Sequence, residues 1–190
     1  MTITGLLLAG GMGRRMGGSD KGLIEIDGQT MAARVIERLR PQVGPLLINA
    51  NRTLETWQTY GLPVISDSIG GFAGPLAGIH AGMHACATPW LVTAPCDSPF
   101  LPLDLVSRLA AAAEKEGTQL AVARSGNRLQ PVFALWHREQ LPALENYLAT
   151  GGRKLEAWFA SRPRAVVDFD DTAAFANINT PEELAQLRPH

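Results

Sequence analysis

The chain has 190 residues, of which 46% are hydrophobic and 18% are charged. This composition is typical of a globular protein with a packed core, and the length predicts one domain spanning residues 1–190. Seventeen lysines and arginines against eighteen acidic residues leave a net charge of −1, which excludes a strongly basic surface for nucleic acid or anionic membranes. Phosphate groups would therefore be bound by a few placed side chains and backbone amides.

Neither the N-terminus nor the cysteines indicate export. The first apolar run, residues 6–9, is too short for a signal sequence or a membrane span. Cys86 and Cys96 are the only cysteines, and they lack the CxxC spacing of a metal or redox motif. Two buried, reduced thiols are favoured over a disulfide, because a chain of this size has an ample core. These features predict a cytoplasmic protein without membrane contact.

Apolar runs typical of strands alternate with stretches typical of helices along the chain. Strands are predicted at residues 2–9, 46–48, 63–65, 90–94, 120–124, 132–136 and 165–167. Helices are predicted at residues 30–42, 54–60, 75–87, 103–116, 139–149 and 155–159, with a terminal helix opened by the capping box Thr180-Pro181-Glu182-Glu183. The strands at 120–124 and 132–136 flank Ser125-Gly126-Asn127 and can pair as antiparallel arms.

This alternation predicts a three-layer α/β/α sandwich around a mostly parallel, Rossmann-like sheet. In such sheets, ligands bind beyond the carboxyl ends of the strands. Four of the predicted strands end in residues suited to a nucleotide and a metal ion. These residues are Gly10 and Gly11, Asn49, Asp67 and Asp97.

A glycine-rich segment, residues 10–22, follows the first predicted strand and contains six glycines in thirteen residues. The backbone amides of such a segment can converge on an anion without obstruction by Cβ atoms. Its spacing matches neither the dinucleotide fingerprint GxGxxG nor the Gly-Lys-Ser/Thr of a Walker loop. Arg14, Arg15 and Lys21 add positive charge, and a lysine near a reacting α-phosphorus would offset charge in the transition state. The combination favours a phosphate-binding loop over a solvated surface loop.

The string LAGGxxxRMGGxDKG, residues 8–22, resembles the signature of the molybdenum cofactor guanylyltransferases, within the nucleotidyltransferases of Rossmann-like fold. Further blocks that resemble this family follow in the same order, so that the resemblance covers nearly the whole chain. They are residues 49–52, 67–68, 74–78, 95–99 and 177–184. Residues 119–165 are less distinctive and carry little of the resemblance.

The resemblance implies transfer of GMP from GTP to the terminal phosphate of molybdopterin, with release of pyrophosphate and with Mg2+ as the metal ion. It assigns the nucleotide and its metal ion to Leu8, Ala9, Gly10, Gly11, Lys21, Asn49, Asp67 and Asp97, with Asp97 holding Mg2+. Lys21, Asp97 and Arg15 would be the catalytic residues. Relatives that transfer CMP have alanine at the position of Gly10, where glycine leaves room for a purine. The family also implies transient contacts with molybdopterin-loading proteins and molybdoenzyme chaperones, and we expect a monomer.

Asp97 indicates a metal site also without the resemblance. It follows an apolar strand and lies between Pro95 and Pro99, which stiffen the turn. A carboxylate fixed at a strand end is a hard oxygen ligand for Mg2+, although an aspartate in a turn or helix cap has the same sequence pattern. Together with the glycine-rich segment, this pattern favours the metal.

Four other polar residues leave alternatives open. Asp67 could bind a base edge or a ribose, or help the metal site, and Asn49 offers both a donor and an acceptor, but both residue types are also common in turns and at strand ends. Asn177 and Asn179 alternate just before the capping box. They could help to hold the metal ion, the phosphates or the pterin, or they could only form local turn hydrogen bonds.

His80 and His84 lie four residues apart on a predicted helix and could share a zinc ion. No glutamate stands between them in an HExxH arrangement, and no third ligand stands out. The sequence therefore favours ordinary helix histidines.

Two other classes of function stay open. One is a nucleotidyltransferase that uses CTP or another phosphate acceptor, such as a sugar phosphate, although such an enzyme usually needs a longer chain. The other is a non-enzymatic GTP-binding module, which could do without a metal-binding carboxylate such as Asp97.

The sequence shows no evident general base. This is consistent with nucleotidyl transfer, because the phosphate acceptor is already anionic at neutral pH.

Overall fold

The structure, a computed structural model, describes residues 1–9, 20–69, 74–178, 180, 182–183 and 186. Its centre is a seven-stranded sheet with the order β5-β4-β1-β6-β8-β7-β9. The strands are β1 (Ile3–Leu8), β4 (Leu46–Asn49), β5 (Val64–Ile65), β6 (Trp90–Pro95), β7 (Leu120–Ser125), β8 (Arg128–His137) and β9 (Ala165–Phe169). Neighbours run parallel except at β8, which is antiparallel to both β6 and β7. The mostly parallel sheet and the predicted antiparallel arms are both confirmed.

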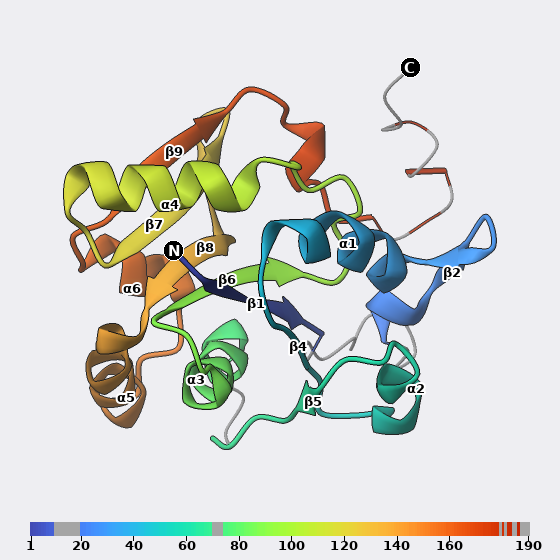
Figure 1. Cartoon of the computed structure of the whole chain (residues 1–190), viewed down its shortest axis with the longest axis horizontal. Coiled ribbons are helices and arrows are strands. Elements are labelled where there is room, and N and C mark those ends of the chain that lie inside the picture. Colours follow the sequence, from blue (N-terminus) through green and yellow to red (C-terminus); the bar gives the residue numbers. More distant parts are fainter. Residues whose placement is uncertain (10–19, 70–73, 179, 181, 184–185, 187–190) are drawn as a thin grey trace.

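Helices cover both faces of this sheet, which confirms the predicted α/β/α sandwich. One face carries α1 (Met31–Leu39) and α4 (Leu105–Glu116), and the other carries α3 (Pro75–Ala85), α5 (Leu141–Ala149) and α6 (Leu155–Ala160) (Figure 1). The short helix α2 (Leu54–Gln58) contributes Trp57 to the core beneath α1. The described residues also form four 3-10 helices: η1 (Lys21–Leu23), η2 (Arg40–Gln42), η3 (Arg138–Gln140) and η4 (Ala173–Phe175).

The sheet divides the apolar residues into two cores. Successive side chains of a strand point to opposite faces, so that in β1 Leu7 enters the core beneath α1 while Leu6 enters the core beneath α3. In β6, Val92 and Leu91 divide in the same way. Burial on both faces explains why these strands are continuous apolar runs rather than alternating ones.

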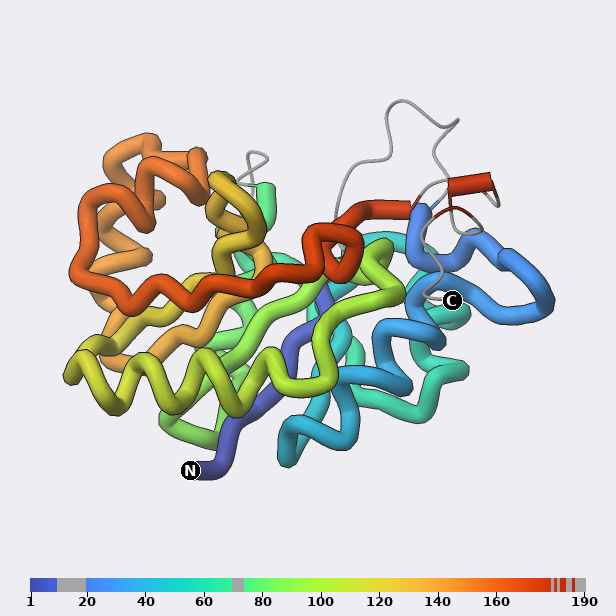
Figure 2. The backbone as a smooth tube through the Cα atoms, turned by 90° about the horizontal axis from the view of Figure 1, so that it is seen from above, coloured from blue at the N-terminus to red at the C-terminus, as the bar shows by residue number. Residues whose placement is uncertain are grey.

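A short hairpin lies outside the predicted elements. Its strands, β2 (Glu25–Ile26) and β3 (Gln29–Thr30), are joined by a two-residue turn of Asp27 and Gly28, with φ of 52° and 72°. Two residues per strand are too few for a hydrophobic period to show in the sequence. The hairpin and the α5–α6 pair lie at opposite ends of the molecule's longest axis (Figure 2).

Most predicted helices differ from the structure by one to three residues at an end; α1, for example, ends at Leu39 rather than at residue 42. The helix α4 begins at Leu105, two residues later than predicted, with Asp104 at the N-cap position. The terminal helix falls largely outside the described residues, but the amide of Glu183 donates to Thr180 Oγ1 at 3.2 Å, as the capping box predicts.

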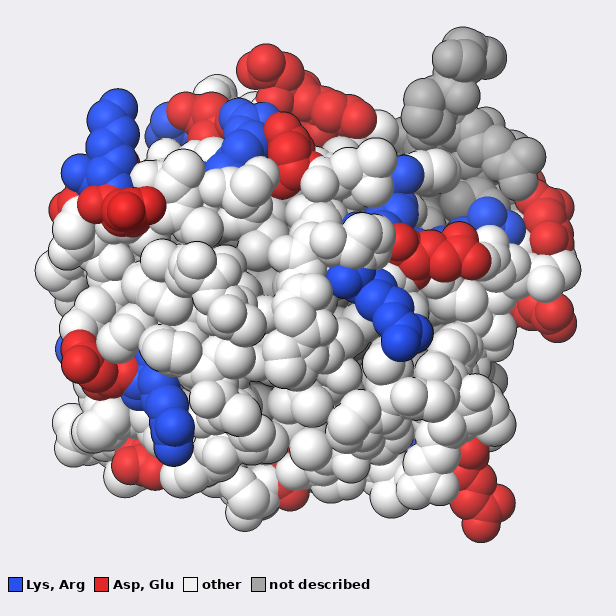
Figure 3. Space-filling view, viewed as in Figure 1, with Lys and Arg blue, Asp and Glu red and all other residues white. Residues whose placement is uncertain are grey.

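The surface agrees with the low net charge. Acidic and basic side chains are interspersed on the face that Figure 3 shows, between large uncharged areas. No helix within the described ranges has the length and apolar character needed to span a membrane.

Candidate nucleotide and metal site

The carboxyl ends of β1, β4, β5 and β6 meet at one edge of the sheet. In the sheet register, Leu8 of β1 lies between Asn49 of β4 and Pro95 of β6. The amide of Ala9 donates to the carbonyl oxygen of Asn49 at 2.9 Å, and the amide of Cys96 donates to that of Leu8 at 3.1 Å. The structure therefore brings together Leu8, Ala9 and Asn49, all predicted to contact the nucleotide.

Two asparagines hold Asp67 at this edge. Asn49 Nδ2 donates to Asp67 Oδ1 at 2.8 Å, and Asn51 Nδ2 donates to Asp67 Oδ2 at 2.8 Å. The amide of Asp67 in turn donates to Asn51 Oδ1 at 2.8 Å. Asn49 is only 2% exposed, so a buried amide orients the carboxylate. The role of Asn51 was not predicted, although the Asn-x-Asn spacing after a strand could have shown that both side chains face one side.

The helix α3 packs directly on this pair because residue 78 is a glycine. A Cβ atom at Gly78 would lie 2.3 Å from Asn49 Oδ1 and 2.8 Å from Leu8 Cδ2, closer than real Cβ contacts allow. Pro75 opens the helix at its first turn, as predicted. The first turns of α3 therefore pack against the carboxyl ends of β1 and β4.

Asp97 and Lys21 lie within electrostatic reach of each other at the same edge. Burial raises the pKa of the Asp97 carboxyl, and the positive charge of Lys21 lowers it. Asp97 follows β6, while Lys21 opens η1. A desolvated carboxylate of this kind gains stability from a divalent cation, so the donor chemistry of Asp97 fits an oxygen-preferring metal ion.

The turn that carries Asp97 is tied to a distant part of the chain. The amide of Ile178 donates to the carbonyl oxygen of Asp97 at 2.8 Å. Ser98 is fully buried, and its Oγ donates to Asn177 Oδ1 at 2.9 Å. The structure thus places Asn177 beside the Asp97 turn through Ser98, and its contact with a metal ion or a substrate stays a prediction.

Asp20 anchors Lys21, a role that was not predicted. Its carboxylate accepts hydrogen bonds from Thr53 Oγ1 at 2.7 Å and Trp57 Nε1 at 3.4 Å, and it pairs with Arg52 at 3.3 Å. The Asp20 side chain is only 5% exposed. These bonds fix the start of η1 against α2. The sequence feature that could have indicated this role is the position of Asp20 immediately before Lys21 in the signature.

Close packing at Gly22 sets the distance between η1 and β6. A Cβ atom there would lie 2.7 Å from Cys96 Sγ and 2.8 Å from Trp57 Cη2. Gly22 directly follows Lys21 and Cys96 directly precedes Asp97, so this fit helps to position both charged groups. Both cysteines of the chain are free and buried, as predicted, and burial raises the pKa of the Cys96 thiol.

Part of the predicted site lies outside the described residues. This applies to Gly10, Gly11, Arg14, Arg15 and Asn179, whose roles stay predictions. The described residues that flank positions 10–19 are both held in place, Ala9 by its bond to β4 and Asp20 by its bonds to Thr53 and Trp57.

A pocket of about 380 Å³ lies beside the Asp97 turn, on the side toward β8. Pro95 and Asn177 line the part next to this turn, and Arg128 and Gln130 from the start of β8 line another part. Arg128 is exposed, and among the described residues no acidic group pairs with its guanidinium. The pocket thus offers a free cation and an amide close to the predicted metal ligand.

Known proteins resemble this chain along nearly its full length. Residues 5–166 match the family model of the MobA-like NTP transferase domain. A molybdenum cofactor guanylyltransferase of Cupriavidus taiwanensis is 58% identical over 187 residues, which cover 96% of this chain and 94% of that protein. The crystal structure of molybdopterin-guanine dinucleotide biosynthesis protein A from Archaeoglobus fulgidus has a TM-score of 0.76 at 23% identity, covering 97% of this chain and 96% of that one. A Mycobacterium tuberculosis protein solved in complex with manganese has a TM-score of 0.68 at 15% identity, covering 98% of both chains.

Proposed function

The chain belongs to the molybdenum cofactor guanylyltransferases of the MobA-like NTP transferase family, and from this premise we propose that it transfers GMP from GTP to molybdopterin. The products are molybdopterin guanine dinucleotide and pyrophosphate. One observation carries the proposal: Lys21 and Asp97 lie within electrostatic reach of each other, at the edge where the strand ends also position Asp67. A protein that only binds a nucleotide could do without a buried, metal-binding carboxylate beside a lysine.

We assign GTP to the β1–β4–β5 side of this edge. Leu8, Ala9 and Gly10 would line the guanine, Gly11 would also bind the nucleotide, and the Asn49–Asp67 pair would hold the base edge or the ribose. The Asp67 carboxylate supports this role, because two asparagine amides orient it while lone pairs on both oxygens stay available for a donor.

The reaction is an in-line displacement at the α-phosphorus of GTP. An oxygen of the molybdopterin phosphate forms a bond to this phosphorus while the bond to the oxygen bridging to the β-phosphate breaks. The electron pair of the broken bond leaves with pyrophosphate. The nucleophile is already anionic, so the site needs no base, and positioning together with the charges of Lys21 and Arg15 supplies the catalysis.

For the metal ion we propose Mg2+, with Asp97 as its protein ligand. The family fold carries manganese in the M. tuberculosis protein, and Mn2+ and Mg2+ both prefer oxygen ligands. Bound at Asp97, Mg2+ would supply positive charge to the triphosphate. The buried carboxylate supports this assignment, because a cation would offset the unfavourable burial of its charge.

We assign molybdopterin to the pocket beside the Asp97 turn. Arg128 can bind phosphate oxygens in a bidentate way, and Gln130 can bond a pterin edge. The strand order puts this pocket on the β6–β8 side and the Asn49–Asp67 pair on the β4–β5 side. The two substrates would therefore flank Lys21 and Asp97.

We further propose that residues 1–190 form one nucleotidyltransferase domain that acts as a cytoplasmic monomer. The single sheet shared by both cores supports one domain. Molybdopterin-loading proteins and molybdoenzyme chaperones would be transient partners. The net charge of −1 gives no reason to propose a nucleic acid or a membrane as a partner.

Calorimetric titration with GTP, CTP and ATP, each with Mg2+, tests the nucleotide site. We expect GTP to bind at least tenfold more tightly than CTP, which is about 1.4 kcal/mol, and Asp97→Ala and Lys21→Ala to weaken GTP binding. Tighter CTP binding would assign the chain to the cytidylyl relatives. No preference among the nucleotides, or no effect of either substitution, would rule out this site.

Pyrophosphate release tests the transfer itself. With GTP, Mg2+ and molybdopterin present, we expect one pyrophosphate for each dinucleotide formed, and none without the acceptor. Tight GTP binding without any pyrophosphate would identify a GTP-binding module instead. Release with a sugar phosphate but not with molybdopterin would identify a different acceptor.

A further inference from the structure

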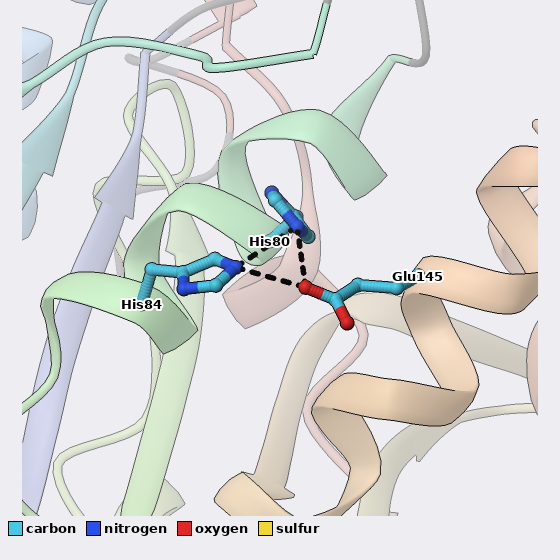
Figure 4. Close-up of side chains that lie close together, drawn as sticks. All are labelled: His80, His84 and Glu145. Carbon is cyan, nitrogen blue, oxygen red and sulfur yellow. Dashed lines mark hydrogen bonds and ion pairs between the residues drawn. The ribbon is translucent and has the colours of Figure 1, made fainter.

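Three side chains that commonly bind metal ions meet between α3 and α5, away from the strand ends. His80 and His84 lie one turn apart on α3, and Glu145 of α5 points toward both (Figure 4). His84 Nε2 lies 3.2 Å from His80 Nε2 and 3.1 Å from Glu145 Oε1, and His80 Nε2 lies 3.5 Å from the same oxygen. The third ligand that the sequence did not reveal comes from 61 residues beyond His84.

These separations match a tetrahedral metal site. Zinc bonds of about 2.0–2.1 Å at tetrahedral angles place neighbouring ligand atoms about 3.3–3.4 Å apart. The three observed separations lie between 3.1 and 3.5 Å, so one ion can reach bonding distance of all three atoms at once. When both histidines carry their protons on Nδ1, three lone pairs face a common point, an arrangement that a cation stabilises.

The surroundings of His80 favour its metal-binding form. Ser68 Oγ lies 3.3 Å from His80 Nδ1 and can accept a hydrogen bond from Nδ1–H, which leaves the Nε2 lone pair facing the cluster. Burial and the neighbouring His84 lower the pKa of His80, although Glu145 raises it, and a lowered pKa favours the neutral ring that binds a metal ion. The other two side chains are 52% (His84) and 47% (Glu145) exposed, which leaves a side open for a water molecule as the fourth ligand.

We propose that His80, His84 and Glu145 bind a divalent transition-metal ion of the zinc class, at a site separate from Asp97. Two histidines and one carboxylate are a typical zinc donor set, whereas Mg2+ prefers oxygen ligands alone. Within the described part of the chain, no other three such groups come as close together. The ion would link α5 to α3 and would add its binding free energy to the stability of the folded state.

Zinc titration of the metal-free, full-length protein tests this site. We expect calorimetry to give one Zn2+ per chain, with affinity reduced at least tenfold by His84→Ala and by Glu145→Gln. Both side chains are about half exposed, so both variants should fold, which circular dichroism verifies. Co2+ in place of Zn2+ should give the visible absorption of tetrahedral coordination, which an octahedral oxygen site does not produce.

His137→Ala is the matched control. His137 also faces a carboxylate, with Nδ1 3.6 Å from Glu139 Oε2, but no third ligand joins them among the described residues. This variant should keep the full Zn2+ affinity. Zn2+ should also raise the melting temperature of the wild-type protein, and not that of His84→Ala.

Three results would overturn the proposal. The first is wild-type binding weaker than about 100 µM, near the affinity of scattered surface groups. The second is an unchanged affinity in His84→Ala, and the third is loss of Zn2+ binding in Asp97→Ala instead, which would place the ion at the phosphate site.

Discussion

At the scale of single residues, the burial of the Asp97 carboxylate disfavours its charged form. Burial raises the pKa of the carboxyl because the charged form loses hydration, and Lys21 offsets only part of this effect. A carboxylate in this state attracts a cation more strongly than one that is fully hydrated. The metal-free protein therefore carries an unfavourable charge that the metal complex would relieve.

Replacing Asp97 with asparagine should separate these two effects. Asp97→Asn removes the charge and keeps the shape, so we expect a melting temperature about 2–4 °C higher in the metal-free protein at pH 7, as roughly 1 kcal/mol produces in a domain of this size. The folded-state pKa of Asp97 lies above its unfolded value, so the stability penalty of the charged form disappears as the pH falls through the folded pKa. The advantage of the variant should therefore shrink toward about pH 4.

Scanning calorimetry with a chelator at both pH values measures this difference. The exposed Asp170 provides the control, because Asp170→Asn removes an equal charge from the surface and should leave the melting temperature unchanged. The transfer rate of Asp97→Asn should fall by about 100-fold. An Asp97→Asn protein less stable than wild type at pH 7 would show that the carboxylate is not strained by burial.

At the scale of elements, α3 connects the two candidate sites. Its first half packs on Asn49 through Gly78, and its second half carries His80 and His84. Almost all of the helix is buried, so its position relative to β1 and β4 is set by close contacts at its two glycines. A Cβ atom added at one of these two glycines should therefore displace the side chain that it contacts.

Alanine substitutions at the two glycines test this arrangement. A Cβ atom at Gly78 would meet Asn49 Oδ1 at 2.3 Å, whereas one at Gly82 would meet Leu6 Cδ2 at 2.5 Å. Both substitutions should lower the melting temperature, because both overpack the helix against the sheet. Only Gly78→Ala should displace the Asn49–Asp67 pair, and we expect calorimetry to show GTP affinity at least tenfold lower in this variant alone. Equal GTP affinities in the two variants would exclude that pair from the nucleotide site.

The sequence predicted most elements and only part of the contacts between them. The main strands and helices were predictable because burial on two faces makes a strand such as β1 a continuous apolar run, and a helix such as α1 an amphipathic one. The hairpin at Asp27 was too short to detect. The Asp20 anchor and the contact of Glu145 with the two histidines join distant segments of the chain, which no local pattern records.

At the scale of the whole molecule, the reversed strand β8 explains why Arg128 and Gln130 were not among the predicted site residues. Ligands were expected at the carboxyl ends of strands, and the parallel strands β1, β4, β5 and β6 bring these ends together at one edge. Because β8 is antiparallel to β6, its beginning reaches the same edge, and this places Arg128 and Gln130 in the pocket beside Asp97. The parallel strands would thus serve the nucleotide, and the reversed one the acceptor.

The two ends of β8 provide a matched pair of arginines to test this division. Arg128 begins the strand at the pocket, and Arg138 directly follows its last residue at the opposite edge, where it is also exposed. Arg128→Ala should raise the KM for molybdopterin about tenfold, as expected for loss of a charge-assisted contact of about 1.4 kcal/mol. The GTP affinity measured by calorimetry should stay unchanged, since the nucleotide contacts lie on the other side of Asp97. Arg138→Ala removes the same charge from the chain and should alter neither value. A parallel fall in GTP affinity in Arg128→Ala would instead assign the pocket to the nucleotide, and an unchanged KM would place the acceptor outside it.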